Sequence, residues 1–218
     1  TLPNSSIPTG PPGLAANFEW WPIKDSEFYV VGTVNDLNAK GGEWVWDRPF
    51  EYGQFFYGLE VGNFWRRTKD DFDHFHLNVF YADERDTKPP VRMIESEAGW
   101  GFKLLGEKQL GRLVGFGSYT YNTVKGGGFG TAIARHAATA GVALLKPLGI
   151  SGELNLGGVW ADPIPDDLRE QYGLNAYWKI LLTPDLWLTP GVQLIFDPSF
   201  NEDKDSLIIG QCKFRFFF

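Results

Sequence analysis

The sequence predicts an all-β protein, a transmembrane antiparallel β-barrel, on three observations. The composition suits strands and tight turns, because the 218 residues include 18 Phe, 9 Trp, 8 Tyr and 26 Gly. Apolar and polar residues alternate with a period of two through most of the chain. The connections between the alternating segments are short and long in turn, as in barrels of the bacterial outer membrane.

The N-terminal half supplies the first of about eleven predicted strands. Residues 14–20, 55–61 and 74–81 each place apolar side chains on one face and polar side chains on the other. In the third of these segments the polar face holds His74, His76 and Asn78. Flanking connections delimit another strand over residues 28–37 and a further one over residues 100–109.

The C-terminal half supplies the other strands. Residues 112–122 alternate less decisively, and the Ala-rich residues 131–145 suggest a β-bulge, an extra residue that interrupts strand pairing. The segments that alternate clearly are residues 150–156, 171–182, 187–197 and 207–218. A strand with one apolar and one polar face separates two environments, here lipid and an aqueous lumen.

The connections sort by length when they are counted back from the C-terminus. The short ones are residues 183–185, 146–149, 110–111 and 23–27, and the long ones are residues 198–205, 162–169, 123–130, 83–99 and 38–53. Residues 62–73 break the pattern, since they should be short and are not. A soluble β-sandwich has no reason for this sorting, whereas outer-membrane barrels have short periplasmic turns and longer outer loops.

Aromatic residues lie near many predicted strand ends, where girdles of aromatic side chains meet the two membrane interfaces. They are Trp20, Trp21, Tyr81, Trp100, Trp160, Trp178, Trp187 and Phe218. The alternative is the ordinary preference of aromatic residues for strands. Since most of these residues share the parity of the apolar face, we favour the girdle.

The odd strand count leaves the predicted barrel open, because single-chain bacterial barrels have an even number of strands. Residues 1–12 contain four prolines and cannot supply a well-paired strand. We therefore expect residues 1–218 to form one outer-membrane barrel domain without its N-terminal strands, residues 1–12 being the remnant of an extracellular loop. A second chain or an N-terminal segment would complete the ring, and a miscount by one strand is the alternative.

Charge and residue usage argue against several other classes of function. The net charge of −7 disfavours nucleic acid as a partner, since such binding needs clustered Lys or Arg. The single cysteine, Cys212, excludes an internal disulfide and a thiolate metal cluster. His74 and His76 share a strand face, but no third metal ligand is visible beside them. No nucleophile and base occur in a supporting pattern, so we expect neither an enzyme nor a cofactor.

Three stretches carry a resemblance: EAGWGFKLLGEKQL, GLNAYWKILLTPDLWLTPGVQLIFDPSFNEDKD and the terminal KFRFFF. Through them residues 99–218 resemble the C-terminal part of the OprB-like carbohydrate-selective porins. Residues 1–98 match more loosely, through GLAANFEWWPI and FYVVGTVNDLNAK. The resemblance implies the C-terminal part of an outer-membrane barrel of about 16 strands. It also implies passive diffusion of sugars, with small-molecule sugars and outer-membrane lipid as partners and no cofactor.

The competing function is a structural or assembly subunit, the barrel of a larger envelope complex without sugar selectivity. The odd strand count favours this alternative, because another chain would have to cover the open strand edges.

A sugar channel needs polar groups that replace water around hydroxyls, held weakly enough for the sugar to leave. Inward parity nominates side chains of both charge signs, which argues against a dedicated anion or cation filter. The candidates are Glu60, His74, His76, Asn78, Lys103, Glu107, Arg135, Glu153, Asn155, Asn175, Tyr177, Lys179, Gln193, Asp197, Lys213 and Arg215. Any one of them could instead only satisfy a polar neighbour, so the prediction rests on the set.

The loop GGEWVWDRPFEYG adds Trp44, Trp46 and Arg48 at alternate positions. It could fold inward and present stacking faces to a sugar, or act as a hydrophobic plug that holds the loop against the barrel wall.

If this loop folds into the lumen, replacing Trp44 and Trp46 with Ala should weaken the block of ionic current by sugars, because two stacking faces are lost. Conductance in planar bilayers during a sugar titration measures the effect. An unchanged block would remove the loop from the mechanism.

Overall fold

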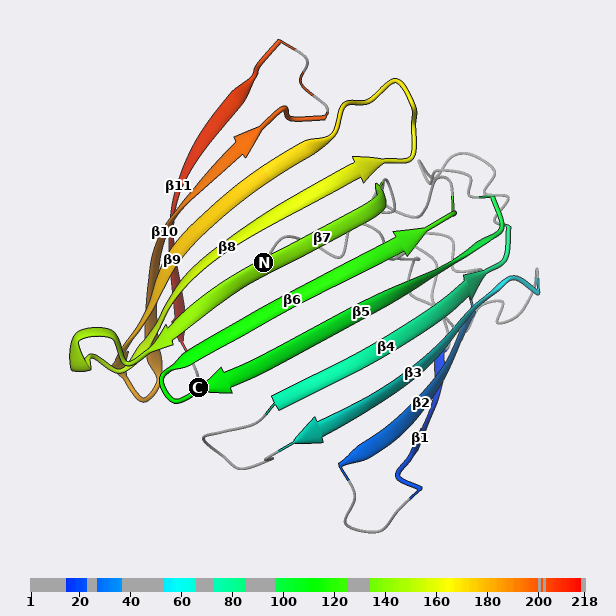
Figure 1. The fold of residues 1–218 in the computed structure, drawn as a ribbon, viewed down its shortest axis with the longest axis horizontal. Helices are drawn as coiled ribbons and strands as arrows, with labels where there is room; N and C mark the ends of the chain where they lie inside the picture. Colours follow the sequence, from blue (N-terminus) through cyan, green and yellow to red (C-terminus); the bar gives the residue numbers. More distant parts are fainter. Residues whose placement is uncertain are drawn as a thin grey trace.

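The computed structural model shows eleven antiparallel strands in one sheet, each paired with the next along the chain (Figure 1). It describes residues 15–22, 27–36, 53–65, 73–84, 97–124, 134–199, 201 and 203–216. The strands are β1 (Ala15–Trp20), β2 (Phe28–Asp36), β3 (Phe55–Trp65), β4 (Asp73–Ala82), β5 (Gly99–Leu110), β6 (Leu113–Asn122), β7 (Ala134–Leu145), β8 (Gly152–Pro163), β9 (Gln171–Thr183), β10 (Leu186–Phe196) and β11 (Ser206–Phe216). The predicted all-β fold and its strand count are confirmed.

The tight turns lie at one end of the sheet (Figure 1). Leu110 pairs with Leu113, which leaves a two-residue turn in which Gly111 adopts a φ of 63°. Such a positive φ favours glycine because no Cβ then meets the backbone. The turn from β7 to β8 contains the 3-10 turn η2 (Pro147–Gly149), where Gly149 has a φ of 80°.

The structure bears on the predicted bulge in β7 and on the length of the β3–β4 connection. The bulge predicted in the Ala-rich segment is confirmed, since the register of β7 against β8 shifts between Ala134 and His136. The break in loop parity at residues 62–73 is smaller than predicted, because β3 continues to Trp65. In the described residues no helix is long and apolar enough to span a bilayer.

The two faces of the sheet differ in polarity. The large apolar side chains that are most exposed within strands include Phe18 at 66%, Leu156 at 55% and Ile208 at 76%. They share one parity, and of the exposed large hydrophobic side chains in the described strands only Ile209 has the other. Exposed apolar surface of this extent and regularity is typical of a face that meets lipid.

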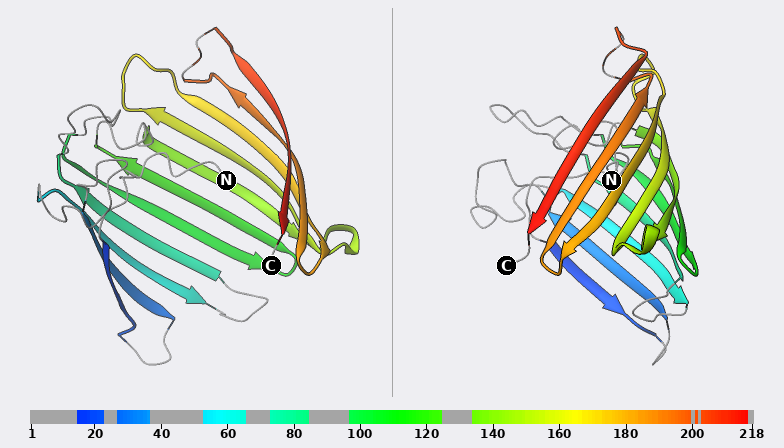
Figure 2. Two further views of the ribbon diagram at one scale, coloured as in Figure 1. Left: turned by 180° about the vertical axis from the view of Figure 1, so that it is seen from behind. Right: turned by 90° about the vertical axis from the view of Figure 1, so that its left-hand side faces the viewer.

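Side chains of the opposite parity converge, which identifies the concave face. The Tyr29 hydroxyl on β2 lies 3.0 Å from His74 Nε2 on β4, so the contact passes over the intervening strand β3. Gly62 of β3 lies beneath it, and a Cβ there would collide with the Tyr29 ring. Figure 2 shows β1 and β11 curving to the same side, so that the sheet forms a trough.

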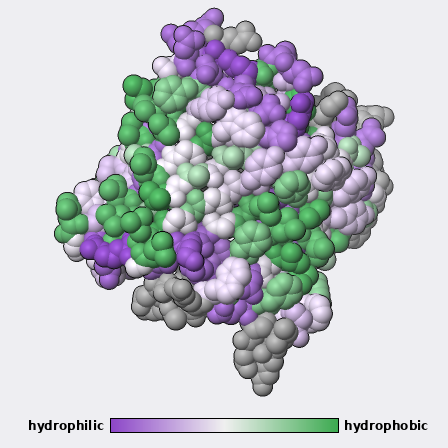
Figure 3. Space-filling view, viewed as in Figure 1, coloured by the Kyte–Doolittle hydropathy of each residue, from purple (hydrophilic) through white to green (hydrophobic). Residues whose placement is uncertain are grey.

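The convex face is seen in Figure 3. Hydrophobic residues cover large areas over the strands, and hydrophilic residues gather at the end that carries the β8–β9 and β10–β11 connections. This banding matches an apolar zone bounded by polar loops.

A row of outward-facing aromatic rings crosses the sheet near its long-loop end. The pairs are Tyr57 with Tyr81 (ring centroids 6.4 Å apart), Trp100 with Tyr121 (5.3 Å) and His136 with Trp160 (6.2 Å). Glu170, just before β9, accepts hydrogen bonds from the Tyr172 hydroxyl (2.7 Å) and from Trp160 Nε1 (2.8 Å). These two hydrogen bonds lower the pKa of the Glu170 carboxyl.

Two of the predicted girdle residues belong to the other face. Trp21 contacts the ring of Tyr29 at 5.4 Å, and Trp187 lies beneath the Lys179 ammonium, so both face the concave side. Phe218 lies outside the described residues.

A charge on the convex face should destabilise the sheet far more than the same charge on the concave face. Val192 and Gln193 are neighbours in the middle of β10, with Val192 outward and Gln193 inward. Val192→Arg should lower the free energy of unfolding by about 2–4 kcal/mol in a bilayer, and Gln193→Arg by about 1 kcal/mol or less. Urea unfolding of protein refolded into lipid vesicles measures both, and equal losses would contradict the assignment of faces.

Candidate functional site

The concave face carries most of the residues that parity nominated. Strand register aligns Glu60, Asn78 and Lys103 in one row across β3, β4 and β5. On the C-terminal strands it pairs Glu153 with Lys179 and Asn155 with Tyr177. Gln193 pairs with Asn175, while Lys213 and Arg215 share the inward parity of β11. Trp44, Trp46 and Arg48 lie outside the described residues.

The first polar group on this face, the β3–β5 cluster, consists of Glu60, His74, His76, Lys103 and Glu107. The Tyr29 hydroxyl donates a hydrogen bond of 2.8 Å to Glu60 Oε1. His76 Nδ1 lies 3.8 Å from the same carboxylate oxygen, an ion-pair contact when the imidazole is protonated. The carboxylate therefore organises the residues around it.

The two histidines of the cluster pack as rings. His74 stacks on Phe64 with ring centroids 4.1 Å apart and an interplanar angle of 8°, and its centroid lies 5.0 Å from that of His76. In the described part of the chain no three His, Cys, Asp or Glu residues come together as a metal site would require. The geometry is that of a polar and aromatic wall.

A second charged group, the β8–β11 cluster, consists of Glu153, Lys179, Lys213 and Arg215. Lys179 Nζ lies 3.5 Å from Glu153 Oε1 and 3.6 Å from the centre of the Trp187 ring. The ammonium is thus held by a carboxylate and by the negative face of an indole. Carboxylates prevail in the first cluster and cations in the second, which creates a field across the trough.

An uncharged cavity of about 170 Å³ lies on β6 to β9 of the concave face. Its lining residues are Phe116, Thr139, Asn155, Gly157, Gly158, Asn175 and Tyr177. The Thr139 hydroxyl shares a hydrogen bond with the Ser118 hydroxyl, with the two oxygens 2.7 Å apart. Only polar amides, hydroxyls and aromatic rings are offered to a solute here.

Sequence reasoning missed Tyr29, Phe116 and Thr139, although all three have the inward parity. Tyr29 has the inward parity of β2, so alternation along that strand could have found it. Residues 112–122 alternate too weakly for the sequence to assign a face to Phe116.

Two nominated residues lie in loop networks at the long-loop end of the sheet. Arg135 Nη2 donates to the Ile164 carbonyl (3.0 Å) and to Asp166 Oδ1 (2.9 Å). Asp197 follows the last residue of β10 and adopts a φ of 50°, at the start of the β10–β11 connection. These two side chains border the mouth of the trough.

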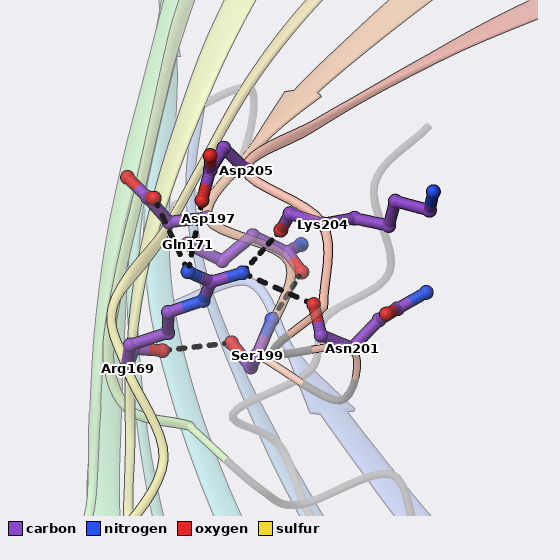
Figure 4. Close-up of polar contacts among 7 residues, drawn as sticks. All are labelled: Arg169, Gln171, Asp197, Ser199, Asn201, Lys204 and Asp205. Atoms are coloured by element: carbon purple, nitrogen blue, oxygen red, sulfur yellow. Dashed lines mark hydrogen bonds and ion pairs between the residues drawn. The ribbon is translucent and has the colours of Figure 1, made fainter.

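Arg169 joins the two C-terminal loops at this mouth (Figure 4). Its guanidinium donates to the carbonyls of Asn201 (3.0 Å) and Lys204 and lies 3.7 Å from a carboxylate oxygen of Asp197 and of Asp205. The Arg169 carbonyl in turn accepts a hydrogen bond of 2.9 Å from the Ser199 hydroxyl. A planar group with five donors suits this ring of acceptors.

Comparisons with known proteins agree with this architecture. A family model described as carbohydrate-selective porin, OprB family, matches residues 94–218, more than half of the 218-residue chain. A comparison with curated proteins gives no match. Among solved structures the chain is similar in fold to the high-pH structure of Pseudomonas putida OprB, with a TM-score of 0.70 and 12% sequence identity. The match covers 93% of this chain and 58% of that one, so this chain spans less than two thirds of its length.

Arg169→Lys should loosen the β10–β11 connection, because one ammonium cannot serve four acceptors arranged for a planar fork. We expect thermolysin to cleave this connection about fivefold faster, the effect of roughly 1 kcal/mol on local opening. Mass spectrometry of timed digests locates the cuts. Lys204→Gln is the matched control, since only the Lys204 carbonyl contacts Arg169, and equal cleavage in all three proteins would contradict the prediction.

Proposed function

Because the chain belongs to the OprB family of carbohydrate-selective porins, we propose that it lets sugars diffuse passively across the bacterial outer membrane. Membership in this family implies a channel rather than an enzyme. The observation that carries the proposal is the reversal of polarity between the two faces of the sheet. Apolar side chains are exposed on the convex face, and charged and amide side chains line the concave one.

The convex face supports the outer-membrane location. Its exposed side chains, such as Leu59, Leu156 and Leu174, would carry a large cost in water and none in lipid. The aromatic row at the long-loop end suits the interface between hydrocarbon and head groups.

The concave face supports a neutral, hydroxyl-rich solute. Its carboxylates and cations are paired in part, as between Glu153 and Lys179, so no single sign of charge dominates the whole wall. The uncharged side chains of Asn155, Asn175 and Tyr177 line one cavity of this wall. We extend the nominated pore-lining set by Tyr29, whose hydroxyl joins Glu60 and His74.

Further strands must close the ring if the sheet spans a membrane. In the described residues β1 and β11 each pair on one side only. An unpaired strand edge in hydrocarbon leaves backbone N–H and C=O groups without partners, which a bilayer does not tolerate. The closing strands come from another segment of the same protein or from a second chain, in a barrel of about 16 strands.

Planar-bilayer conductance of the natively purified full-length protein tests the proposal. We expect open channels whose current is blocked saturably by glucose and maltose, and far less by triethylene glycol, a neutral solute without the array of hydroxyls on a sugar. Weak, saturable block is expected because transit requires contacts that release the solute. Block by all three solutes alike would contradict sugar selectivity, and an absence of conductance would contradict the channel itself.

A further inference from the structure

The uncharged cavity on the concave face is lined by two side-chain amides, each with one buried polar atom that has no hydrogen-bond partner among the described residues. Asn155 is 94% buried, since only 6% of its surface is exposed, and its side-chain amide nitrogen has no hydrogen-bond partner among the described residues. The buried Oδ1 atom of Asn175 is likewise unpaired there. Both residues line the same cavity. A buried polar atom without a partner is costly, so such atoms mark places where another molecule binds.

The positions of the two amides follow from the register of β8 and β9. Asn155 pairs with Tyr177, and Gly157 pairs with Asn175, so the two Asn side chains are diagonal neighbours on one face. Diagonal neighbours in an antiparallel pair lie within about 7–8 Å of each other, close enough for one small group to contact both side chains.

The chemistry of the pair selects a neutral hydroxyl. Asn155 offers a donor and Asn175 offers an acceptor, and a hydroxyl group both accepts and donates. A cation could use only the acceptor, and an anion only the donor. No charged side chain lines the cavity, and the nearby Lys179 is already paired with Glu153 at 3.5 Å.

The rest of the cavity suits the body of a sugar ring. Phe116 of β6 and Tyr177 of β9 supply aromatic rings, on which the C–H face of a pyranose can stack. Gly157 also lines the cavity and adds no side-chain volume to it. The volume of about 170 Å³ is below the 300–1,000 Å³ typical of pockets that enclose a ligand, so it suits one ring in transit.

We propose that Asn155 and Asn175, with Phe116 and Tyr177, form a subsite that holds one pyranose ring through a hydroxyl bridging the two amides. This subsite rests on the proposed function, since it names where in the wall the sugar pauses. One bridging hydroxyl contributes only two hydrogen bonds, so binding at the subsite is weak and compatible with passage.

The test is current block by glucose in planar bilayers, with the full-length protein and single variants. Asn155→Ala and Asn175→Ala should each raise the glucose concentration for half-maximal block about five- to tenfold, the usual effect of losing one hydrogen bond. Conductance without sugar should change by less than about twofold, because no charge is altered. Asn155→Asp keeps the size of the side chain but cannot donate when ionised. It should lose the block similarly and shift the reversal potential toward cation preference.

Asn201→Ala is the matched control, because Asn201 lies in the β10–β11 connection and contacts Arg169 through its carbonyl. Its glucose block should equal that of the unmodified protein. Each variant is first checked for heat-modifiable migration on gels, and Asn155→Asp decides the question if an Ala variant fails to fold. Glucose block in the unmodified protein that survives in all Asn155 and Asn175 variants would overturn the subsite while the porin function stands. Conductance without glucose-specific block in the unmodified protein would overturn both.

Discussion

In the outer-membrane setting that we propose, the structure depends on one constraint: every backbone amide in hydrocarbon must find a hydrogen-bond partner within the protein. A meander meets this need simply, because each strand pairs with its two neighbours in sequence, and the eleven strands here follow that order without a crossover. The same constraint explains why the connections are tight at one end, where Gly111 allows a two-residue turn between β5 and β6. For the same reason, the unpaired backbone N–H and C=O groups at the free edges of β1 and β11 in the described sheet would be costly in hydrocarbon.

In the hydrogen-bonded sheet, successive side chains point to opposite faces. Because the sheet is curved, the side chains are spread apart on one face and brought together on the other. On the convex face side chains diverge, so Leu156 and Ile208 remain exposed. On the concave face they converge, and large residues fit only where small ones lie beside them. A Cβ on Gly62 would collide with Tyr29, and one on Gly141 would collide with Phe116. The aromatic lining of the trough therefore depends on the positions of these glycines as well as on the aromatic residues.

This division explains which parts of the molecule the sequence predicts. Period-two alternation follows from strand geometry alone, so it predicted the strands, their faces and the inward side chains of Glu60, His76 and Lys179. It could not place Trp187, because an indole suits a lipid interface and a cation–π contact with Lys179 equally well. Nor could it separate Asp197 from the wall, since alternation continues in the sequence past Phe196 while a positive φ turns the backbone into the Arg169 network. Contacts between non-adjacent strands, such as that of Tyr29 with His74, depend on curvature, which a one-dimensional pattern does not contain.

Charge placement links these features to the transport that we propose. Two charged groups of the wall have partners where they lie: Glu60 accepts a hydrogen bond from the Tyr29 hydroxyl and lies 3.8 Å from His76 Nδ1, and Lys179 contacts Glu153 and the Trp187 ring. A charge with such partners still polarises its surroundings but holds a counter-ion less tightly. The cavity on β6 to β9 is lined by uncharged side chains, and the buried Asn155 Nδ2 and Asn175 Oδ1 atoms have no hydrogen-bond partner among the described residues. In the proposed channel, a neutral solute meets a field that orients its dipoles and then donors and acceptors that replace its water.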